Sequence, residues 1–378
     1  MAPAVRRHRR RRGPHRRAPR RPHRGQPRGR GHRPRPRGRA VRTGDQPRSP
    51  PGPHDPAPRR PQRTPGPRPQ GRAPVHLDRT TEGPRVIIDA HVHAGEYYRH
   101  YTAAFAEEMM ATTGMPPEAL TAPEGRLLAH MDDAGVDRAF LLAFDVWRIE
   151  GFKVPNEFVA AICARHPDRF TGFASVDAGT PGAADELRRA VTELGLAGLK
   201  TAPCYLRMSP ADPRWNDVYE VAQELDVPVL VHTGYTPAKK ADPRFFSPRL
   251  LDRVAADFPG LRLILAHLGT PWTDTALDLM SRHSRVYADL SIFSWYRPAA
   301  TVAAALARAR SLGVLDRLLW GTDHPFCTMT DSVSRMRELA AADSLWPDGT
   351  ALTPAEYASL MGGAAAGLLA ATHGGTIR

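Results

Sequence analysis

The chain has 378 residues, with 53 Lys and Arg against 39 Asp and Glu, a net charge of +14. Residues 1–85 hold 26 arginines and four acidic residues, a net charge of +22, whereas residues 86–378 hold 27 basic and 35 acidic residues, a net charge of −8. The basic average therefore gives no reason to expect nucleic-acid binding by residues 86–378. No run of 18 apolar residues occurs, so we expect no membrane-spanning helix.

Residues 1–85 contain 19 of the 38 prolines and no Ile, Phe, Tyr, Trp or Asn. Such a segment buries too little apolar surface to offset chain entropy, so we predict that it is disordered. Three interpretations compete: a basic arm that binds nucleic acid, a targeting segment, and upstream GC-rich DNA translated before a start at Val86. The targeting segment fails because no apolar h-region follows the arginines. We favour the misplaced start over the functional arm.

From residue 86 onward, short aliphatic runs alternate with amphipathic ones. The runs predict eight strands, at residues 86–93, 138–144, 170–176, 198–200, 228–232, 262–267, 285–291 and 317–323. Helices are predicted between them, over residues 156–166, 182–194, 215–225, 247–258, 274–283 and 300–312. The segment 94–134 is longer than a simple connection, and we expect it to form an extra loop and helix over the carboxyl ends of the strands. A terminal helix is predicted from Pro354, with a break at Gly362 and Gly363.

Eight strands separated by helices indicate a parallel sheet covered on both faces. A (β/α)₈ TIM barrel formed by residues 86–378 is the economical closure, with an open doubly wound sheet as the alternative. The three cysteines are few and not arranged as C-x-x-C, which favours a reducing compartment, and we expect a cytoplasmic protein.

Metal-binding residue types stand at the predicted strand ends. His91 and His93 are two residues apart on the first strand, so they point to the same face. His232, His267 and Asp323 end later strands, and such ends meet at one rim of a barrel. A single such histidine is more often a hydrogen-bonded core residue, but the combination predicts a metal site.

Three imidazoles and one carboxylate, from His91, His93, His232 and Asp323, suit one divalent ion. We expect Zn²⁺, with Mn²⁺, Fe²⁺ or Co²⁺ as alternatives. A water bound to that ion would have a pKa of roughly 7. Asp323 can accept its proton, and His267 can polarise a substrate oxygen or shuttle a proton.

The motifs IIDAHVH, VLVHTG, LILAHLG, VYADLS and LLWGTDHPF together resemble the amidohydrolase superfamily. The resemblance is to the amidohydrolase-related group that contains aminocarboxymuconate-semialdehyde decarboxylase, and it spans Val86 to about Leu369. It implies a (β/α)₈ barrel, one divalent metal on the four ligands above, His267 as the catalytic acid or base, and a possible homodimer. The G-N-A motif of the family's terminal helix reads Gly363-Ala364-Ala365 here, which does not touch the metal ligands.

Other rim residues have several possible roles. Lys200 could be carbamylated between two metal ions, pair with an acid, or hold a substrate carboxylate, and we favour the last two. Asp289 could accept a hydrogen bond from a ligand histidine, although a purely structural hydrogen bond is also possible. Arg99, Tyr205 and Trp272 are candidates for substrate binding, with simple wall packing as the alternative.

Two enzyme functions share this site. We rank first a hydrolase whose metal-activated water attacks a small amide, ester or lactone. The alternative is a non-oxidative decarboxylase of a small carboxylated acid, aromatic or muconate-like. A third hypothesis treats the barrel as a scaffold tethered to nucleic acid by residues 1–85, which we disfavour because that segment lacks aromatic residues for base stacking. The expected partner is a small-molecule substrate.

Overall fold

The computed structural model describes residues 86–111 and 114–370, so the predicted disordered arm, residues 1–85, lies outside the described residues. Eight strands form one parallel sheet in chain order. They are β1 (Ile88–His93), β2 (Arg138–Leu142), β5 (Phe170–Ser175), β6 (Gly198–Thr201), β7 (Val229–Val231), β8 (Leu263–Leu265), β9 (Val286–Asp289) and β10 (Leu318–Leu319). Each predicted strand is present at its predicted place.

The sheet closes between its first strand and the segment that follows its last. Ala90 N donates to Trp320 O at 2.9 Å, and Asp323 N donates to His91 O at 2.8 Å. These bonds continue the sheet past β10 and join it to β1, which is the closure that defines a barrel. The predicted (β/α)₈ barrel is therefore confirmed, and the open doubly wound sheet is excluded.

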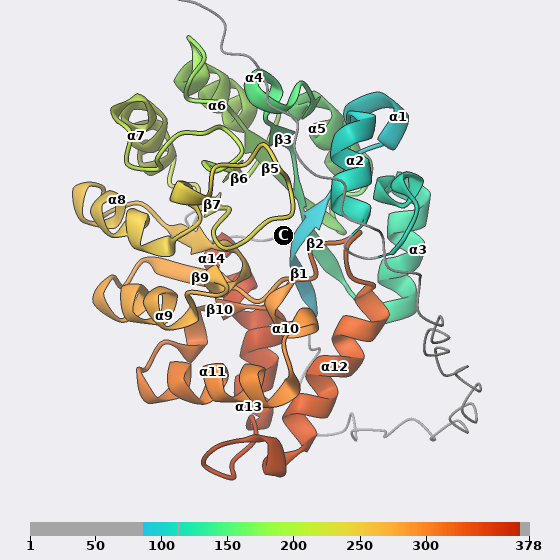
Figure 1. Cartoon of the computed structure of the whole chain (residues 1–378), viewed down its shortest axis with the longest axis vertical. Coiled ribbons are helices and arrows are strands. Elements are labelled where there is room, and N and C mark those ends of the chain that lie inside the picture. The colour runs from blue at the N-terminus through green and yellow to red at the C-terminus, as the bar shows by residue number, and fades with distance from the viewer. Residues whose placement is uncertain (1–85, 112–113, 371–378) are drawn as a thin grey trace, which may run out of the picture. The chain divides into compact units, whose positions relative to one another are not determined.

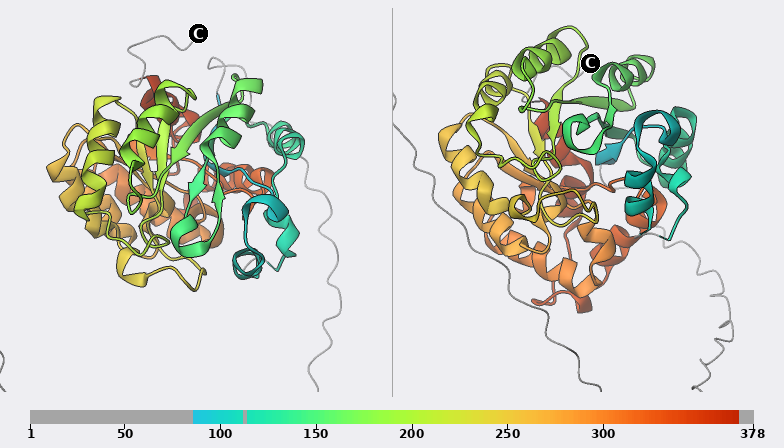
Figure 2. Two further views of the ribbon diagram at one scale, coloured as in Figure 1. Left: turned by 90° about the horizontal axis from the view of Figure 1, so that it is seen from above. Right: turned by 45° about the horizontal axis from the view of Figure 1, so that its top comes forward.

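Helices surround the strands in a ring (Figures 1 and 2). The ring contains α3 (Glu124–Ala134), α5 (Asn156–Arg165), α6 (Ala183–Thr192), α7 (Asn216–Glu224), α8 (Leu251–Asp257), α9 (Thr273–Arg282), α11 (Ala299–Ser311) and α12 (Met329–Ala341). The sequence did not predict α12, nor the hairpin of β3 (Phe144–Asp145) and β4 (Lys153–Val154). No helix in the described ranges has the length and apolarity needed to cross a membrane.

Side chains alternate between two cores with the period of two that a strand imposes. On β7, Leu230 packs in the barrel interior, whereas Val229 and Val231 pack outward in the core beneath the helices. The interior core also includes Ala365 and Leu368 of α14 (Ala364–Ala370). The terminal helix therefore covers the amino-terminal end of the barrel, and the opposite end stays free for a site.

An irregularity in β1 aims its two histidines. The register with β2 shifts between Asp89 and Val92. Before the shift Ala90 packs in the barrel interior, and after it Val92 packs in the outer core. A bulge of this kind re-aims side chains locally, and here it directs both His91 and His93 to the mouth. The sequence pattern predicted a regular strand.

Several predicted strands end one to four residues earlier than expected, and two of these differences move site residues. β8 stops at Leu265 and β10 at Leu319, so His267 and Asp323 lie beyond the strands rather than at their ends. Both residues have left-handed backbones, with φ of 59° and 60°. Non-glycine residues rarely adopt this conformation, and it is found at functional sites. The turn that each residue makes directs its side chain across the barrel mouth.

The long segment after β1 covers the mouth, as the sequence predicted. It contains α1 (Tyr97–His100), α2 (Ala103–Met110) and a 3₁₀ turn (Pro117–Leu120) before α3. Phe105 and Met109 of α2 and Leu120 line the cavity described below. This insertion supplies one wall of the site.

Gly362 and Gly363 are adjacent in the chain but differ in how closely they are packed against the start of the barrel. The π-helical turn Ser359–Gly363 packs Gly362 so closely on the Val86 carbonyl that an added Cβ would collide with that oxygen, whereas Gly363 is exposed and has room. We predict that Gly362→Ala lowers the free energy of unfolding by about 1–3 kcal/mol, the cost of overpacking. Gly363→Ala should leave it unchanged or raise it by up to about 1 kcal/mol, because alanine favours helix. Urea denaturation of both variants measures the difference, and equal effects would contradict this packing.

Candidate metal centre and its cavity

Polar residues that are far apart in the chain meet at the barrel mouth. His91 and His93 come from β1, His232 follows β7, His267 follows β8, and Asp323 follows β10. All but His93 are buried. The carboxyl ends of parallel barrel strands share one rim, which explains why five such separate positions converge.

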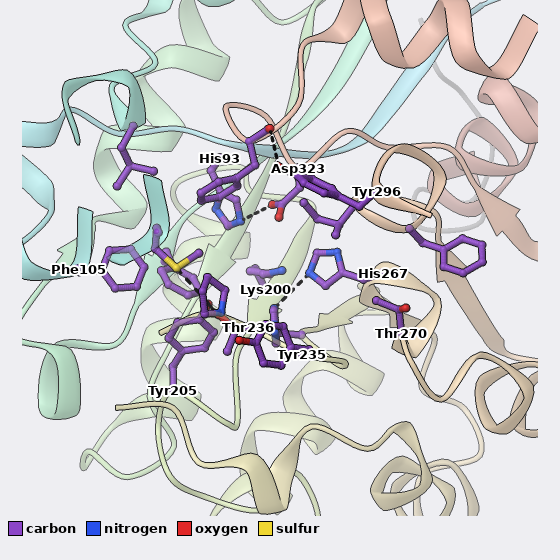
Figure 3. A pocket seen from close by; sticks show the side chains of 18 of the residues that line it. His93, Phe105, Lys200, Tyr205, Tyr235, Thr236, His267, Thr270, Tyr296 and Asp323 are labelled. Carbon is purple, nitrogen blue, oxygen red and sulfur yellow. Dashed lines mark hydrogen bonds and ion pairs between the residues drawn. The ribbon is translucent and has the colours of Figure 1, made fainter. Parts of the chain in front are cut away.

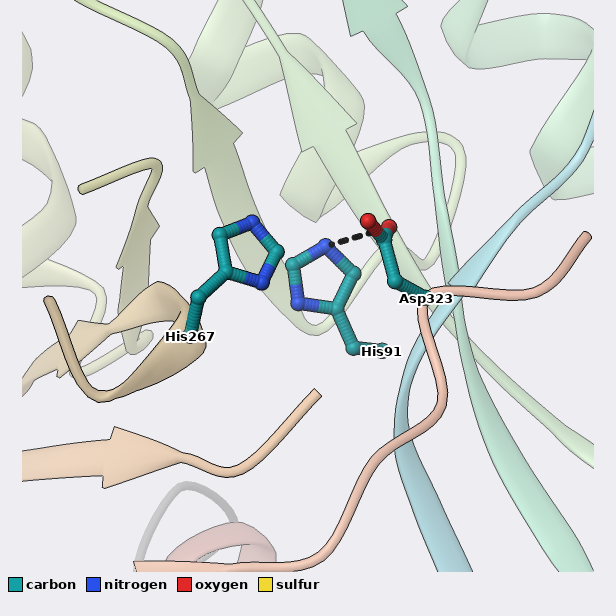
Figure 4. A group of neighbouring side chains, drawn as sticks. All are labelled: His91, His267 and Asp323. Carbon is teal, nitrogen blue, oxygen red and sulfur yellow. Dashed lines mark ion pairs between the residues drawn. The ribbon is translucent and has the colours of Figure 1, made fainter. Parts of the chain in front are cut away.

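The Asp323 carboxylate lies against both histidines of β1. Its Oδ1 atom is 3.3 Å from His91 Nε2 and 3.1 Å from His93 Nε2. Figure 4 shows His91 between Asp323 and His267. Burial raises the pKa of this carboxyl, but His91 and His93 outweigh burial and hold the pKa well below its usual range. Asp323 is therefore an anion at the centre of the cluster.

The most compact set of ligand atoms differs from the predicted four. Across the described ranges, the one group of three or more ligand-type side chains whose atoms all lie within 4.8 Å of one another is His91, His267 and Asp323. His232 adjoins this group through His267, with 3.3 Å between His232 Nδ1 and His267 Nε2. The cluster thus contains all five predicted residues, and which imidazoles bind a metal stays a prediction.

Asp289, at the end of β9, fixes the orientation of His91. Its Oδ2 atom is 2.9 Å from His91 Nδ1. Burial raises the pKa of Asp289, but the adjacent His91 outweighs it and lowers the pKa to about 2. An ionised carboxylate only accepts hydrogen bonds, so His91 carries its proton on Nδ1. Burial lowers the pKa of His91, so the imidazole holds this one proton, and its Nε2 lone pair then faces both Asp323 Oδ1 and Lys200 Nζ.

Ser291 joins the same network, although it was not among the residues predicted from the sequence. Its hydroxyl makes a very short hydrogen bond to Asp289 Oδ1 and lies 3.0 Å from His91 Nδ1 and 2.8 Å from His267 Nδ1. His267 Nδ1 is also 3.2 Å from the Ser291 carbonyl, which is purely an acceptor, so His267 carries its proton on Nδ1. A signal was present: Asp289 and Ser291 are two residues apart, so a strand continued past Asp289 would place both on one face.

The proton positions on His91 and His267 also determine the proton position on His232. Together they show whether the cluster offers free lone pairs to a metal. With a proton on His267 Nδ1, His267 Nε2 can only accept, so His232 Nδ1 must donate to it. His232 Nε2 is then a lone pair, and it is buried without a hydrogen-bond partner among the described residues. A buried acceptor with no partner is costly. Together with the His91 lone pair that faces a carboxylate, it makes a donor set that fits a divalent cation.

Lys200 of β6 lies on the floor of the site. Its Nζ atom is 3.0 Å from His91 Nε2, and the side chain is fully buried. Burial lowers the pKa of this ammonium to about 8. Asp323 and Asp289 act in the opposite direction and favour its charged form. Lys200 therefore adds a cation beside the imidazoles, in a position to meet an anionic substrate.

A cavity of about 500 Å³ opens above the cluster (Figure 3). Its floor includes His93, Lys200, His232, His267 and Asp323. Its walls are mainly aromatic and aliphatic, from Tyr101, Phe105, Met109, Leu120, Phe144, Tyr205, Tyr235, Trp272, Ile292, Phe293, Tyr296 and Phe326. An apolar cavity with a few convergent polar groups is typical of a small-molecule site.

The predicted substrate-binding residues separate into two groups. Lys200, Tyr205 and Trp272 line the cavity. Arg99 does not: it lies on α1 in a second, more open pocket, next to Glu96. The helical turn at Tyr97–His100 turns this side chain away from the mouth, which a sequence pattern could not reveal. The cation that lines the cavity near its opening is instead Arg297.

Comparison with known proteins places the chain in a family. Residues 88–370 match the model of a family described as amidohydrolase. A gamma-resorcylate decarboxylase of Rhodococcus jostii is 32% identical over 147 residues, which cover 30% of this chain and 44% of that protein. The matched part of the chain thus spans less than half of the length of that curated relative.

Solved structures share the fold at lower identity. An uncharacterised TIM-barrel protein of Bordetella bronchiseptica superposes with a TM-score of 0.63 at 21% identity, covering 76% of this chain and 99% of the other. A dihydroxybenzoic acid decarboxylase of Polaromonas, solved with bound manganese and 2-nitroresorcinol, gives a TM-score of 0.54 at 21% identity, covering 75% and 97%. Because the family model covers most of the chain and the resemblance predicted from its motifs agrees with it, the chain belongs to the amidohydrolase family.

Proposed function

We propose that this protein is a metal-dependent carboxy-lyase that removes CO₂ from a carboxylated aromatic acid. The observation that carries the proposal is the cavity itself, which has aromatic walls above a floor of imidazoles, Lys200 and Asp323. Aromatic walls complement a flat ring, and Lys200 complements the carboxylate on it. The same floor beneath a polar cavity would favour a different substrate.

The comparisons support this choice over the hydrolase that the sequence analysis ranked first. Gamma-resorcylate decarboxylases recur among the curated relatives, at 28–35% identity. A 2-amino-3-carboxymuconate-6-semialdehyde decarboxylase of Dictyostelium discoideum is 28% identical over 97 residues. Each alignment spans part of the relative only, so the activity of this chain rests on the site as well as on these names.

The reaction needs a proton and no oxidant. The bond between the ring carbon and the carboxylate breaks, its electron pair returns to the ring, a proton occupies the vacated position, and CO₂ leaves. We assign the proton transfer to His267 and Asp323. His267 Nε2 bears no proton in the tautomer set by Ser291, so it can take one from solvent and pass it on. Lys200 would hold the carboxylate in place.

A divalent ion fits the donor atoms described above, and His91, His93, His232 and Asp323 would hold it. When bound, such an ion supplies Lewis-acid polarisation of a substrate oxygen. Three imidazoles favour Zn²⁺ among the divalent metals. The manganese in the Polaromonas structure belongs to that protein and keeps Mn²⁺ as the alternative.

A substrate panel tests the activity. We expect the protein to release CO₂ from hydroxylated benzoates, such as 2,6-dihydroxybenzoate, and to lose this activity after dialysis against a chelator. Added Zn²⁺ or Mn²⁺ should restore it, and elemental analysis of the untreated protein identifies the resident ion. Hydrolysis of lactones, esters or amides without CO₂ release from any carboxylated ring would contradict the proposal and return the hydrolase to first place.

Two substitutions separate metal binding from proton transfer. Asp323→Asn should lose most of the bound metal, because it removes the anion that faces two imidazoles. His267→Gln should keep the metal and lower kcat by roughly 10²–10⁴-fold, the range for loss of a general acid or base. Metal content and steady-state kinetics are measured on the same preparations, with circular dichroism to verify folding. Loss of metal in His267→Gln would show that His267 is a ligand.

Ser291 is a positioning residue in this proposal, because its hydroxyl orients both His91 and His267. Ser291→Ala should weaken metal binding by about 10–100-fold, as expected for partners behind ligand histidines. The imidazole ¹⁵N resonances should also report a mixture of tautomers. Ser294→Ala is the matched control, since Ser294 is buried nearby but its hydroxyl has no hydrogen-bond partner among the described residues. Equal affinities in the two variants would remove Ser291 from the site.

A further inference from the structure

The rim of the cavity is unusually rich in exposed aromatic side chains. Among the described residues seven large apolar side chains are exposed, and three of them, Tyr235, Trp272 and Tyr296, line this one cavity. Their exposed fractions are 65%, 37% and 46%. Exposed apolar surface gathered at the mouth of a cavity is typical of a surface that a ligand covers. A one-ring acid bound at the floor would leave it uncovered.

The three aromatic residues come from three successive loops that are bonded to their neighbours. Tyr235 N, after β7, donates to Thr270 O at 2.9 Å in the loop after β8. The Tyr296 hydroxyl, after β9, lies 3.4 Å from Phe326 O in the loop after β10. The rim is therefore built as a continuous surface. It does not depend on one loop alone.

The segment Ile292–Arg297, here called the rim segment, begins with a strained residue. Ile292 has φ 59° and ψ −50°, a conformation that is strained for a β-branched residue. On one side it is fixed by Ser291, which is bonded to the imidazoles, and on the other by the short helix α10 (Phe293–Tyr296). Ile292, Phe293, Tyr296 and Arg297 all line the cavity. The strained turn thus couples the floor of the site to its rim.

Arg297 places a positive charge at this rim that has no acidic partner among the described residues. The side chain is exposed and lines the cavity, and its guanidinium makes no ion pair or hydrogen bond with any described residue. Its backbone is held on both sides, because its N–H donates to Phe293 O at 3.2 Å and its carbonyl accepts from Arg335 Nη2 at 3.1 Å. Most other cations near the barrel mouth already have acidic partners, as Arg148 does with Asp177 and Lys240 with Glu150. Arg297 is therefore available to an anion that enters the cavity.

From these observations we infer that the rim segment selects an extended aromatic diacid. Such a substrate has a reacting carboxylate at the floor, an apolar body against Tyr235, Trp272 and Tyr296, and a second anionic group at Arg297. The cavity of about 500 Å³ has room for it, since a water molecule occupies about 30 Å³ and a single substituted ring displaces only a few. The inference rests on the proposed function for the role of the floor, but Arg297 and the rim are independent of the reaction.

Binding of two matched probes tests this inference without requiring turnover. Biphenyl-3-carboxylate and biphenyl-3,4′-dicarboxylate differ only in the distal carboxylate, and calorimetry on the full-length protein measures both affinities. We expect the diacid to bind about 3–10-fold tighter, a modest factor because an exposed ion pair is screened by water. In Arg297→Gln the diacid should fall to the affinity of the monoacid, and monoacid binding should not change.

Arg249→Gln is the control, because Arg249 is another exposed arginine without a side-chain partner among the described residues, and it lies outside the cavity lining. It should keep the preference for the diacid. An unchanged preference in Arg297→Gln would overturn the inference, as would a wild-type protein that binds 2,6-dihydroxybenzoate but neither biphenyl probe. Altered self-association of Arg297→Gln with unchanged probe binding would overturn it as well, since a second copy of the chain would then be the occupant of the rim. Because binding is measured, failure of the carboxy-lyase proposal leaves these results interpretable.

Discussion

The hydrogen bond between His91 Nδ1 and Asp289 is the interaction on which the site depends. It places the proton of His91 on the side away from the cavity, and Ser291 extends the same constraint to His267. Through His267 the constraint reaches His232. His91 Nε2 then presents its lone pair to Asp323 and to Lys200 Nζ, and His267 Nε2 accepts from His232 Nδ1. His232 Nε2 is left as a buried lone pair without a hydrogen-bond partner among the described residues. Acceptors crowded around a carboxylate in this way repel one another unless a cation lies among them.

The barrel supplies what such a network requires, which is a fixed backbone behind every member. Asp289 ends β9, and its Oδ1 atom accepts from the backbone N–H groups of His267 and Ser291, each at 3.0 Å. Asp89 plays a similar part under Asp323, since its carboxylate accepts from the N–H and hydroxyl groups of Thr322 at 2.9 and 2.6 Å. Both buried carboxylates therefore hold loops that carry functional side chains. Short loops bonded in this way can keep left-handed residues such as His267 in place.

The sequence predicted the scaffold well because its signals are local and repeated. Most of the aliphatic runs are followed by a predicted helix, and the order of eight such runs leaves few topologies. The convergence of His91, His93, His232, His267 and Asp323 also followed, because strand ends in a barrel share a rim. Details that depend on backbone irregularity did not follow. The bulge in β1 and the left-handed turns at His267 and Asp323 depend on tertiary contacts. The alternation of side chains along a strand does not predict such contacts.

Substrate-facing residues were the least predictable, and two arginines show why. Arg99 was expected in the cavity because it follows the first strand closely, yet one helical turn rotates it into another pocket. Arg297 lies eight residues beyond Asp289, and its place on the rim is set by the strained turn at Ile292 and by α10. The catalytic floor is constrained by the barrel, whereas the rim is constrained only by loops. The specificity that we infer for this chain therefore depends on the part of the site that the fold itself leaves free.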